Sequence, residues 1–197
     1  MTLGYAQQIA GEIRARLVPH CLPGRCVVAG STRRRKPLDI HDIEIVCIPK
    51  TVPEPTLFGE PMPVRDPAFC AALDGIGPKV LGDAHGKMAT RWIGSDAADD
   101  LTGDDPVKLD CFMATPENWG LILAIRTGSA DWCAKRLMTG LRARGIACRD
   151  GAIRRVGFDP EGRLRDDEPG EPLDASDERE VLALAGIPWT EPEDRTA

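Results

Sequence analysis

Apolar residues follow two kinds of pattern in the first part of this chain. The runs at 25–29 and 42–48 are short and rich in β-branched residues, which predicts two strands. Before them, apolar residues recur at helical spacing after Thr2, a good N-cap residue, and the pattern stops before Pro19. The run 107–113 predicts a further strand. We therefore expect a helix followed by two strands of a sheet, joined later by a third.

The rest of the pattern predicts shorter elements. Residues 49–65 carry five prolines and are expected to form an ordered surface loop or an insertion, and the acid-rich run 95–105 a hairpin loop. The other expected elements are a helix from Pro67 capped by Asp66 and ending at Gly75, a strand within 86–94, two helices separated by Thr127, Gly128 and Ser129, the second with Ser129 as N-cap and Gly145 after its end, a hairpin turning at Asp150 and Gly151, a helix over 176–185 stopped by Gly186, and a surface tail from Glu191 to Arg195.

The strand at 42–48 carries two acids. Side chains alternate between the faces of a strand, so Asp42 and Glu44 point the same way. A third acid, Asp110, shares a face of its strand with Lys108, whereas Asp39 has the wrong spacing and reads as loop. Adjacent carboxylates repel unless a cation lies between them, and hard oxygen ligands favour Mg²⁺ or Mn²⁺. The alternative for an acid-x-acid strand is a solvated face.

A glycine and a serine follow the first strand. Gly30 allows the backbone to approach a ligand, and exposed N–H groups with the Ser31 hydroxyl are suited to an anion. Arg33, Arg34 and Arg35 add positive charge a few residues later. A triphosphate site beside a two-metal carboxylate site predicts phosphoryl or nucleotidyl transfer.

Composition is ordinary for a globular protein, with 42% hydrophobic and 28% charged residues. No apolar run is long enough to span a membrane and no signal-peptide block begins the chain, so we expect a cytoplasmic protein without a membrane partner. The net charge is −6, but basic residues are in excess over 1–50 and 119–165. Such segments are suited to lining a groove for a polyanion, and they are equally typical of solvated faces.

Seven cysteines are scattered without metal-binding spacing. Several of them, among them Cys47, Cys111 and Cys133, fall at apolar positions, which predicts buried reduced thiols. Cys21 and Cys26 flank a Pro-Gly turn, and a disulfide between them on oxidation is the less favoured alternative to free thiols.

The order of these features resembles a known family. The Gly-Ser turn, the basic residues and the acid-x-acid strand resemble the nucleotidyltransferase superfamily, and nearly the whole chain resembles family X DNA polymerases of the polymerase beta type. The resemblance implies an α/β palm, a mixed sheet flanked by helices, at 1–118 and a small α+β thumb at 119–197. It implies that two Mg²⁺ or Mn²⁺ ions are held by Asp42, Glu44 and Asp110, that nucleotide is bound by Gly30, Ser31, Arg34, Thr127, Gly128 and Ser129, and that DNA is contacted by Lys108, Arg91 and Arg126.

The chain departs from the family pattern at informative places. Glu44 stands where the family has aspartate, and Ile125 and Arg126 stand where it has the tyrosine and phenylalanine that discriminate against ribose. Sugar choice is therefore open. The chain resembles the minimal palm-and-thumb members, without the lyase and fingers module.

We expect a monomeric, metal-dependent DNA polymerase that adds a nucleoside monophosphate from a (d)NTP to a DNA 3′-hydroxyl, as in gap-filling repair synthesis. The alternatives are a nucleotidyltransferase with another acceptor, such as a protein or an RNA end, and a DNA-binding module without catalysis.

Overall fold

The computed structural model describes residues 1–56, 59–93, 107–165, 167 and 169–196. The loop predicted at 95–105 lies outside them. Contacts divide the chain into two compact units, Met1–Thr32 with Lys36–Ala114, and Arg33–Arg35 with Thr115–Ala197. Apart from Arg33–Arg35, the second unit consists of the chain from Thr115 onward, and the division into palm and thumb at 118–119 stays a prediction. None of the helices in the described part of the chain has the length and apolar character to cross a membrane.

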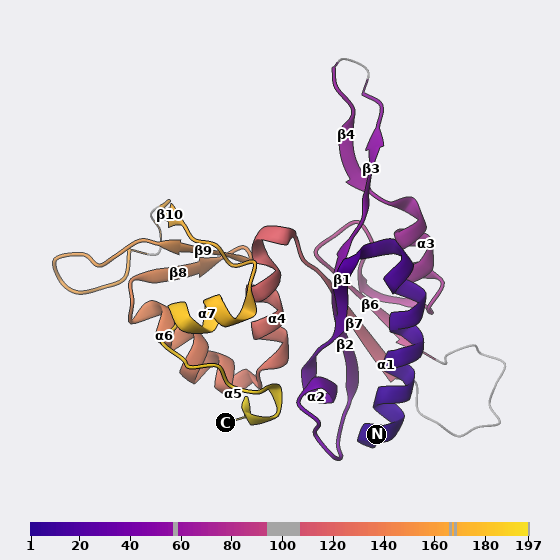
Figure 1. Cartoon of the computed structure of the whole chain (residues 1–197), viewed down its shortest axis with the longest axis horizontal. Helices are drawn as coiled ribbons and strands as arrows, with labels where there is room; N and C mark the ends of the chain where they lie inside the picture. The colour runs from indigo at the N-terminus through magenta and orange to yellow at the C-terminus, as the bar shows by residue number, and fades with distance from the viewer. Residues whose placement is uncertain (57–58, 94–106, 166, 168, 197) are drawn as a thin grey trace. The chain divides into compact units, whose positions relative to one another are not determined.

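A mixed five-stranded sheet forms the centre of the first unit (Figure 1). Its inner pair, β2 and β7, is parallel, and all its other neighbouring strands are antiparallel. The strands lie in the order β1 (Cys21–Val28), β2 (Asp42–Pro49), β7 (Val107–Met113), β6 (Met88–Ile93) and β5 (Lys79–Gly82). The strands predicted from the sequence are confirmed, and β5 is an addition.

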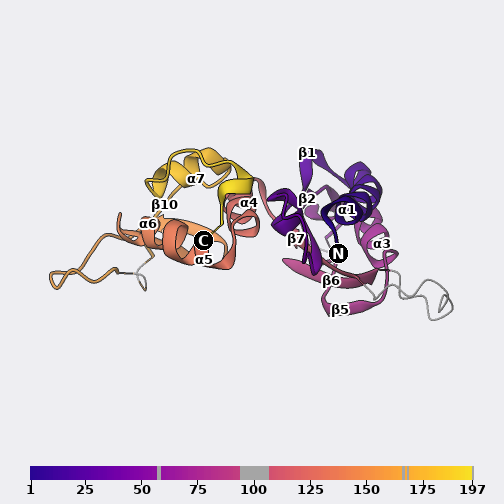
Figure 2. The same ribbon diagram turned by 90° about the horizontal axis from the view of Figure 1, so that it is seen from below.

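Two helices, α1 (Leu3–Leu17) and α3 (Pro67–Asp74), cover one face of this sheet (Figure 2). The caps are as predicted, because Thr2 accepts a hydrogen bond from the Tyr5 amide and Asp66 accepts one from Ala68. The buried side of α1 packs on apolar residues of β2 and β7 in one core. A short 3-10 turn, η1 (Val18–His20), leads from α1 into β1. The opposite face carries the acids of β2 and β7 together with the buried Val46 and Phe112.

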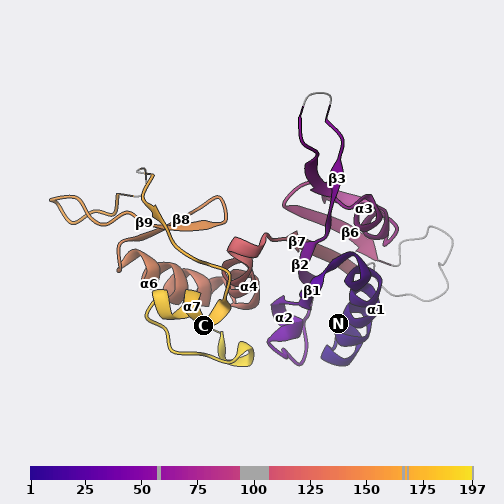
Figure 3. The same ribbon diagram turned by 45° about the horizontal axis from the view of Figure 1, so that its top comes forward.

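The proline-rich segment, expected to be a surface loop or an insertion, forms a hairpin. Strands β3 (Thr51–Glu54) and β4 (Met62–Arg65) pair antiparallel and extend from the five-stranded sheet (Figure 3). Pro53 lies opposite Pro63 in this ladder. Proline has no N–H to donate, but each strand of a two-stranded ribbon has an open edge where no donor is needed.

The second unit packs helices against a small sheet ordered β10-β9-β8. Its core joins residues of α4, the following helix, the hairpin and α7. The elements are η2 (Pro116–Asn118), α4 (Trp119–Thr127), α5 (Ala130–Trp132), a π-helical turn η3 (Cys133–Met138), α6 (Thr139–Arg142), β8 (Ile146–Arg149), β9 (Ala152–Arg155), β10 (Glu171–Pro172), α7 (Glu178–Leu184) and η4 (Pro192–Asp194). The short helix α2 (Gly30–Arg33) belongs to the first unit except for its last residue.

Most local predictions for this unit are confirmed. Ser129 caps the helix that follows it by accepting from the Trp132 amide at 3.1 Å. Asp150 and Gly151 have φ of 54° and 78°, as a type I′ turn requires. Helix α7 is capped by Asp177, which accepts from two amides of the first turn, so it begins later than the predicted Ser176.

Candidate active site

Parallel pairing of β2 with β7 brings the three predicted acids together. Asp42 lies opposite Lys108 in the register, and Glu44 lies opposite Asp110. All four side chains are half-buried, while Ile43, between the two acids of β2, is fully buried against the helices. The acids therefore share the face of the sheet that the helices do not cover.

Lys108 provides the positive charge between two of these acids. Its Nζ lies 2.9 Å from Asp110 Oδ2 and 3.6 Å from Asp42 Oδ2. The hydrogen bond to Asp110, with the charges of both carboxylates, raises the pKa of Lys108 above its ordinary value. The ammonium group of Lys108 is thus the cation that offsets the repulsion between the Asp42 and Asp110 carboxylates.

Thr90, on the adjacent strand β6, fixes the third acid. It is paired with Asp110 in the register, and its Oγ1 donates to Asp110 Oδ1 at 2.6 Å. With one oxygen bound by a hydroxyl and the other by Lys108, the Asp110 carboxylate has a fixed orientation. Thr90 was not among the site residues predicted from the sequence. The only available signal was its place on the strand predicted within 86–94.

Gly30 is required by the position of Glu44. Its φ is +61°, and a Cβ added there would lie 1.9 Å from Glu44 Oε2. The Ala29 amide also donates to the Glu44 carbonyl at 2.8 Å. The end of β1 is thus built against the second acid, and the half-buried Ser31 follows within the single turn α2.

The donor set suits a hard divalent cation, because it consists of carboxylate oxygens with a threonine hydroxyl behind one of them. As the side chains lie, however, no group of three acidic, histidine or cysteine residues within the described ranges is arranged to hold a metal ion. Asp42 and Asp110 already share one cation, Lys108. The residues therefore fit a metal in the chemistry of their side chains, and an ion bound there would take the place of Lys108 at the two carboxylates.

A largely buried ion cluster holds the arginine segment Arg33–Arg35 within the second unit. Arg33 Nη1 and Nη2 donate to the two carboxylate oxygens of Glu178 at 2.9 and 2.8 Å. Arg195 Nη1 donates to Glu178 Oε1 at 2.6 Å. Glu178 is buried and Arg195 is completely so, which corrects our prediction that the tail up to Arg195 lies on the surface. Arg195 also lies over the rings of Trp132 and Trp189, at 5.7 and 4.9 Å.

No sequence signal identified this cluster. A glutamate in the first turn of a helix is typical of an exposed, dipole-stabilised position, and Glu178 has that position in α7. The arginine near the chain end follows prolines and acids, which predict surface. Burial of both side chains depends on partners that are distant in sequence.

The predicted nucleotide-binding residues 127–129 lie beside this cluster. Thr127 is buried, and its hydroxyl accepts from Arg33. Arg34, the predicted triphosphate ligand, donates to the Thr127 carbonyl at 2.6 Å. The Ser129 amide donates to the Arg195 carbonyl at 3.0 Å, and a Cβ on Gly128 would clash with Trp132. Arg126 is half-buried at the end of α4.

Arg91 is not placed to bind DNA. It is 2% exposed, donates to the Thr90 carbonyl at 3.0 Å and pairs with Asp74 of α3. It shares its face of β6 with the buried Ala89, whereas Thr90 points to the acids. The prediction that Arg91 contacts phosphate is therefore wrong, because strand alternation directs it beneath the sheet.

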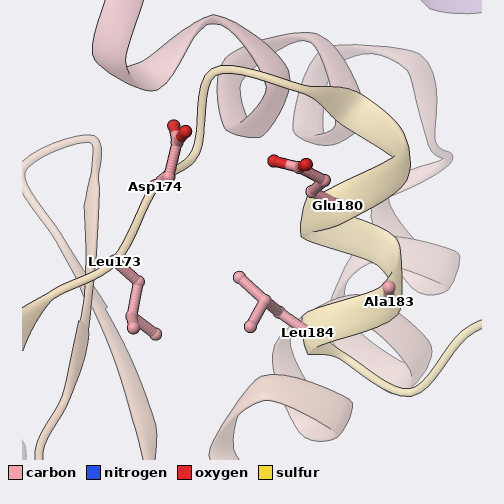
Figure 4. A pocket seen from close by; sticks show the side chains of 5 residues that line it. All are labelled: Leu173, Asp174, Glu180, Ala183 and Leu184. Atoms are coloured by element: carbon pink, nitrogen blue, oxygen red, sulfur yellow. The ribbon is translucent and has the colours of Figure 1, made fainter.

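The pocket drawn in Figure 4 lies in the second unit, between α7 and the preceding segment with Leu173 and Asp174. It is lined by Leu173, Asp174, Glu180, Ala183 and Leu184. None of these is a predicted site residue, so the pocket is not part of the candidate active site.

No protein-family profile matches the sequence, and no curated protein sequence matches it. A solved structure does resemble it, that of Leishmania infantum polymerase beta in a ternary P/T complex. The TM-score is 0.64 at 14% sequence identity, and the match covers 99% of this chain and 76% of the other. At this identity the likeness establishes the fold, a mixed α/β fold like that of polymerase beta.

Proposed function

We propose that this protein is a metal-dependent nucleotidyltransferase of the family X type that adds a nucleoside monophosphate from a (d)NTP to a DNA 3′-hydroxyl. The polymerase beta-like fold supports this proposal. The observation that carries it is the placement of Asp42, Glu44 and Asp110 on one uncovered face of paired strands, with Gly30 closed against Glu44. We further propose that the protein is a monomer in the cytoplasm and that its reaction is gap-filling synthesis.

Asp42, Glu44 and Asp110 would hold two Mg²⁺ or Mn²⁺ ions, which supply charge neutralisation on phosphate and activation of the attacking hydroxyl. The chain supplies the rest. Thr90 keeps Asp110 oriented through the 2.6 Å hydrogen bond, and Lys108 neutralises the acids until nucleic acid phosphate offers it another partner. No protein nucleophile is needed, because the acceptor carries the attacking group.

The triphosphate would be bound by the backbone at Gly30 and Ser31 and by Arg34, with residues 127–129 beside the sugar. Arg33 has a different role in this proposal. Because it forms two hydrogen bonds with the buried Glu178, it fixes the segment that carries Arg34. Arg126, half-buried before Thr127, remains the proposed DNA contact of this unit together with Lys108 of the first.

Primer extension tests the proposal. Labelled gapped duplex, single-stranded DNA and an RNA end are each offered with single nucleotides and Mg²⁺ or Mn²⁺. We expect incorporation on gapped duplex and its loss in Asp110→Asn. Asp39→Asn is the matched control, because Asp39 is an exposed acid three residues before Asp42 whose φ of 56° asparagine also adopts.

Labelling of RNA or of protein alone would replace the DNA acceptor while leaving nucleotidyl transfer intact. Equal incorporation by Asp110→Asn and the native protein, or none by either with both metals, would overturn the catalytic proposal and leave a DNA-binding module.

A further inference from the structure

Four thiols converge in the core of the first unit, on the helix-covered side of the sheet. Cys21 and Cys26 come from β1, Cys47 from β2 and Cys111 from β7, and each is at most 3% exposed. The sulfurs of Cys47 and Cys111 are 3.7 Å apart. All of the cysteines are in the free thiol form, and among the described residues no cysteine group is arranged to hold a metal ion. We therefore consider the reactions of these four cysteines as thiols and not as metal ligands.

The register of β1 on β2 brings Cys21 beside Cys26. Cys21 pairs with Pro49 and Cys26 with Cys47, so five steps along β1 correspond to only two along β2. The residues between them bulge outward, and all of Leu22–Arg25 is exposed. Cys21 and Cys26 consequently occupy successive same-face positions at the base of the bulge, where Cα atoms are about 6 to 7 Å apart, within the range that a disulfide spans.

The two thiols are also chemically unequal. Hydrogen bonds from Cys26 and then Cys47 hold the pKa of Cys21 well below its ordinary value, with His20 and Lys50 adding positive charge nearby. The same contact with Cys21, together with burial, raises the pKa of Cys26. The thiolate is the nucleophilic form of cysteine, and the positive charge near Cys21 favours that form there.

We infer that Cys21 and Cys26 form an oxidant-responsive disulfide that closes the base of the Leu22–Arg25 bulge. With a hydroperoxide as oxidant, the Cys21 thiolate attacks one peroxide oxygen, which forms a sulfenic acid and releases the other oxygen as water or alcohol after protonation. The sulfur of Cys26 then attacks the Cys21 sulfur, its proton leaves, and water departs as the S–S bond forms. The two sulfurs together lose two electrons to the peroxide, and no metal takes part.

Peptide mapping gives a direct test. The full-length protein is treated with hydrogen peroxide, remaining thiols are alkylated under denaturing conditions, and the sample is digested with trypsin without reduction. Trypsin cuts after Arg16, Arg25 and Arg33, which separates Cys21 in peptide 17–25 from Cys26 in peptide 26–33. We expect these two peptides to be recovered joined, at a mass lower than their sum by two hydrogen atoms, and to separate on reduction.

The other cysteines supply the contrasts. Cys47 lies in peptide 36–50, so a link from it to either partner has a different mass and would overturn the assignment. Recovery of Cys21 and Cys26 as alkylated thiols, at peroxide concentrations that oxidise the exposed Cys148, would also overturn it. Cys148→Ser is expected to keep the link, and Cys26→Ser to lose it. If Cys26→Ser fails to fold, peptide mapping of the oxidised native protein decides the proposal by itself.

Discussion

Neutralising Glu178 is expected to destabilise the second unit strongly. In Glu178→Gln the side chain keeps its size and one oxygen acceptor but loses the charge that Arg33 and Arg195 share. Those arginines donate three hydrogen bonds of 2.6 to 2.9 Å to the carboxylate. Because the Arg195 side chain is completely buried and that of Glu178 is 9% exposed, water cannot replace the charge that Arg195 loses.

The magnitude follows from this burial. Removing one partner of a buried ion pair costs about 3–5 kcal/mol. For Glu178→Gln we expect a loss at the lower end, about 3 kcal/mol, because the amide oxygen still accepts a hydrogen bond. For a domain of this size each kcal/mol corresponds to roughly 4–8 °C, so the melting midpoint should fall by at least ~10 °C.

Urea unfolding followed by tryptophan fluorescence measures this loss in the appropriate part of the chain. Trp119, Trp132 and Trp189 belong to the second unit, and only Trp92 belongs to the first. Glu180→Gln is the matched control, because Glu180 lies in the same first turn of α7 but is exposed. It loses only the helix-dipole contribution of about 0.3–1 kcal/mol that Glu178→Gln also loses.

If the two variants unfold within about 0.5 kcal/mol of each other, a difference typical of surface substitutions, the reasoning is refuted. The charge of Glu178 would then contribute nothing beyond its place in the helix.

Three further changes test the first unit. Gly30→Ala places a Cβ on the Glu44 carboxylate at positive φ, so we expect primer extension to be lost, with about 1–2 kcal/mol of backbone strain seen in urea unfolding. Lys108→Met removes the cation that Asp42 and Asp110 share and should raise the affinity for Mn²⁺ roughly tenfold, or 1.4 kcal/mol. Calorimetry without DNA measures this affinity, and an unchanged value would show that Lys108 does not compete with the metal. Arg91→Met should lower the free energy of unfolding by about 2 kcal/mol while the DNA Kd in a binding titration stays the same, and weaker DNA binding by a stably folded variant would contradict its buried position.

Local chemistry determined much of the fold. The caps at Thr2, Asp66 and Ser129 and the turn at Asp150 depend on groups only a few residues apart, so the sequence alone predicted them. Strand periodicity likewise placed Asp42 and Glu44 on one face. Whether these acids hold metal and nucleotide stays a prediction.

Other features depended on distant partners. The proline-rich segment can form a hairpin because a two-stranded ribbon has edges that need no donor. Strand alternation puts Arg91 on the helix-covered face, and Asp74 of α3 is the partner that it finds there. The Glu178 carboxylate is buried only because Arg33 and Arg195, from far along the chain, provide its charge balance. A single sequence gives the periodicity of each strand but not which strands become neighbours, and the energy of a buried charge depends on those neighbours. Tertiary structure therefore decided where the ionic groups lie, whereas the sequence had already determined most of the elements that carry them.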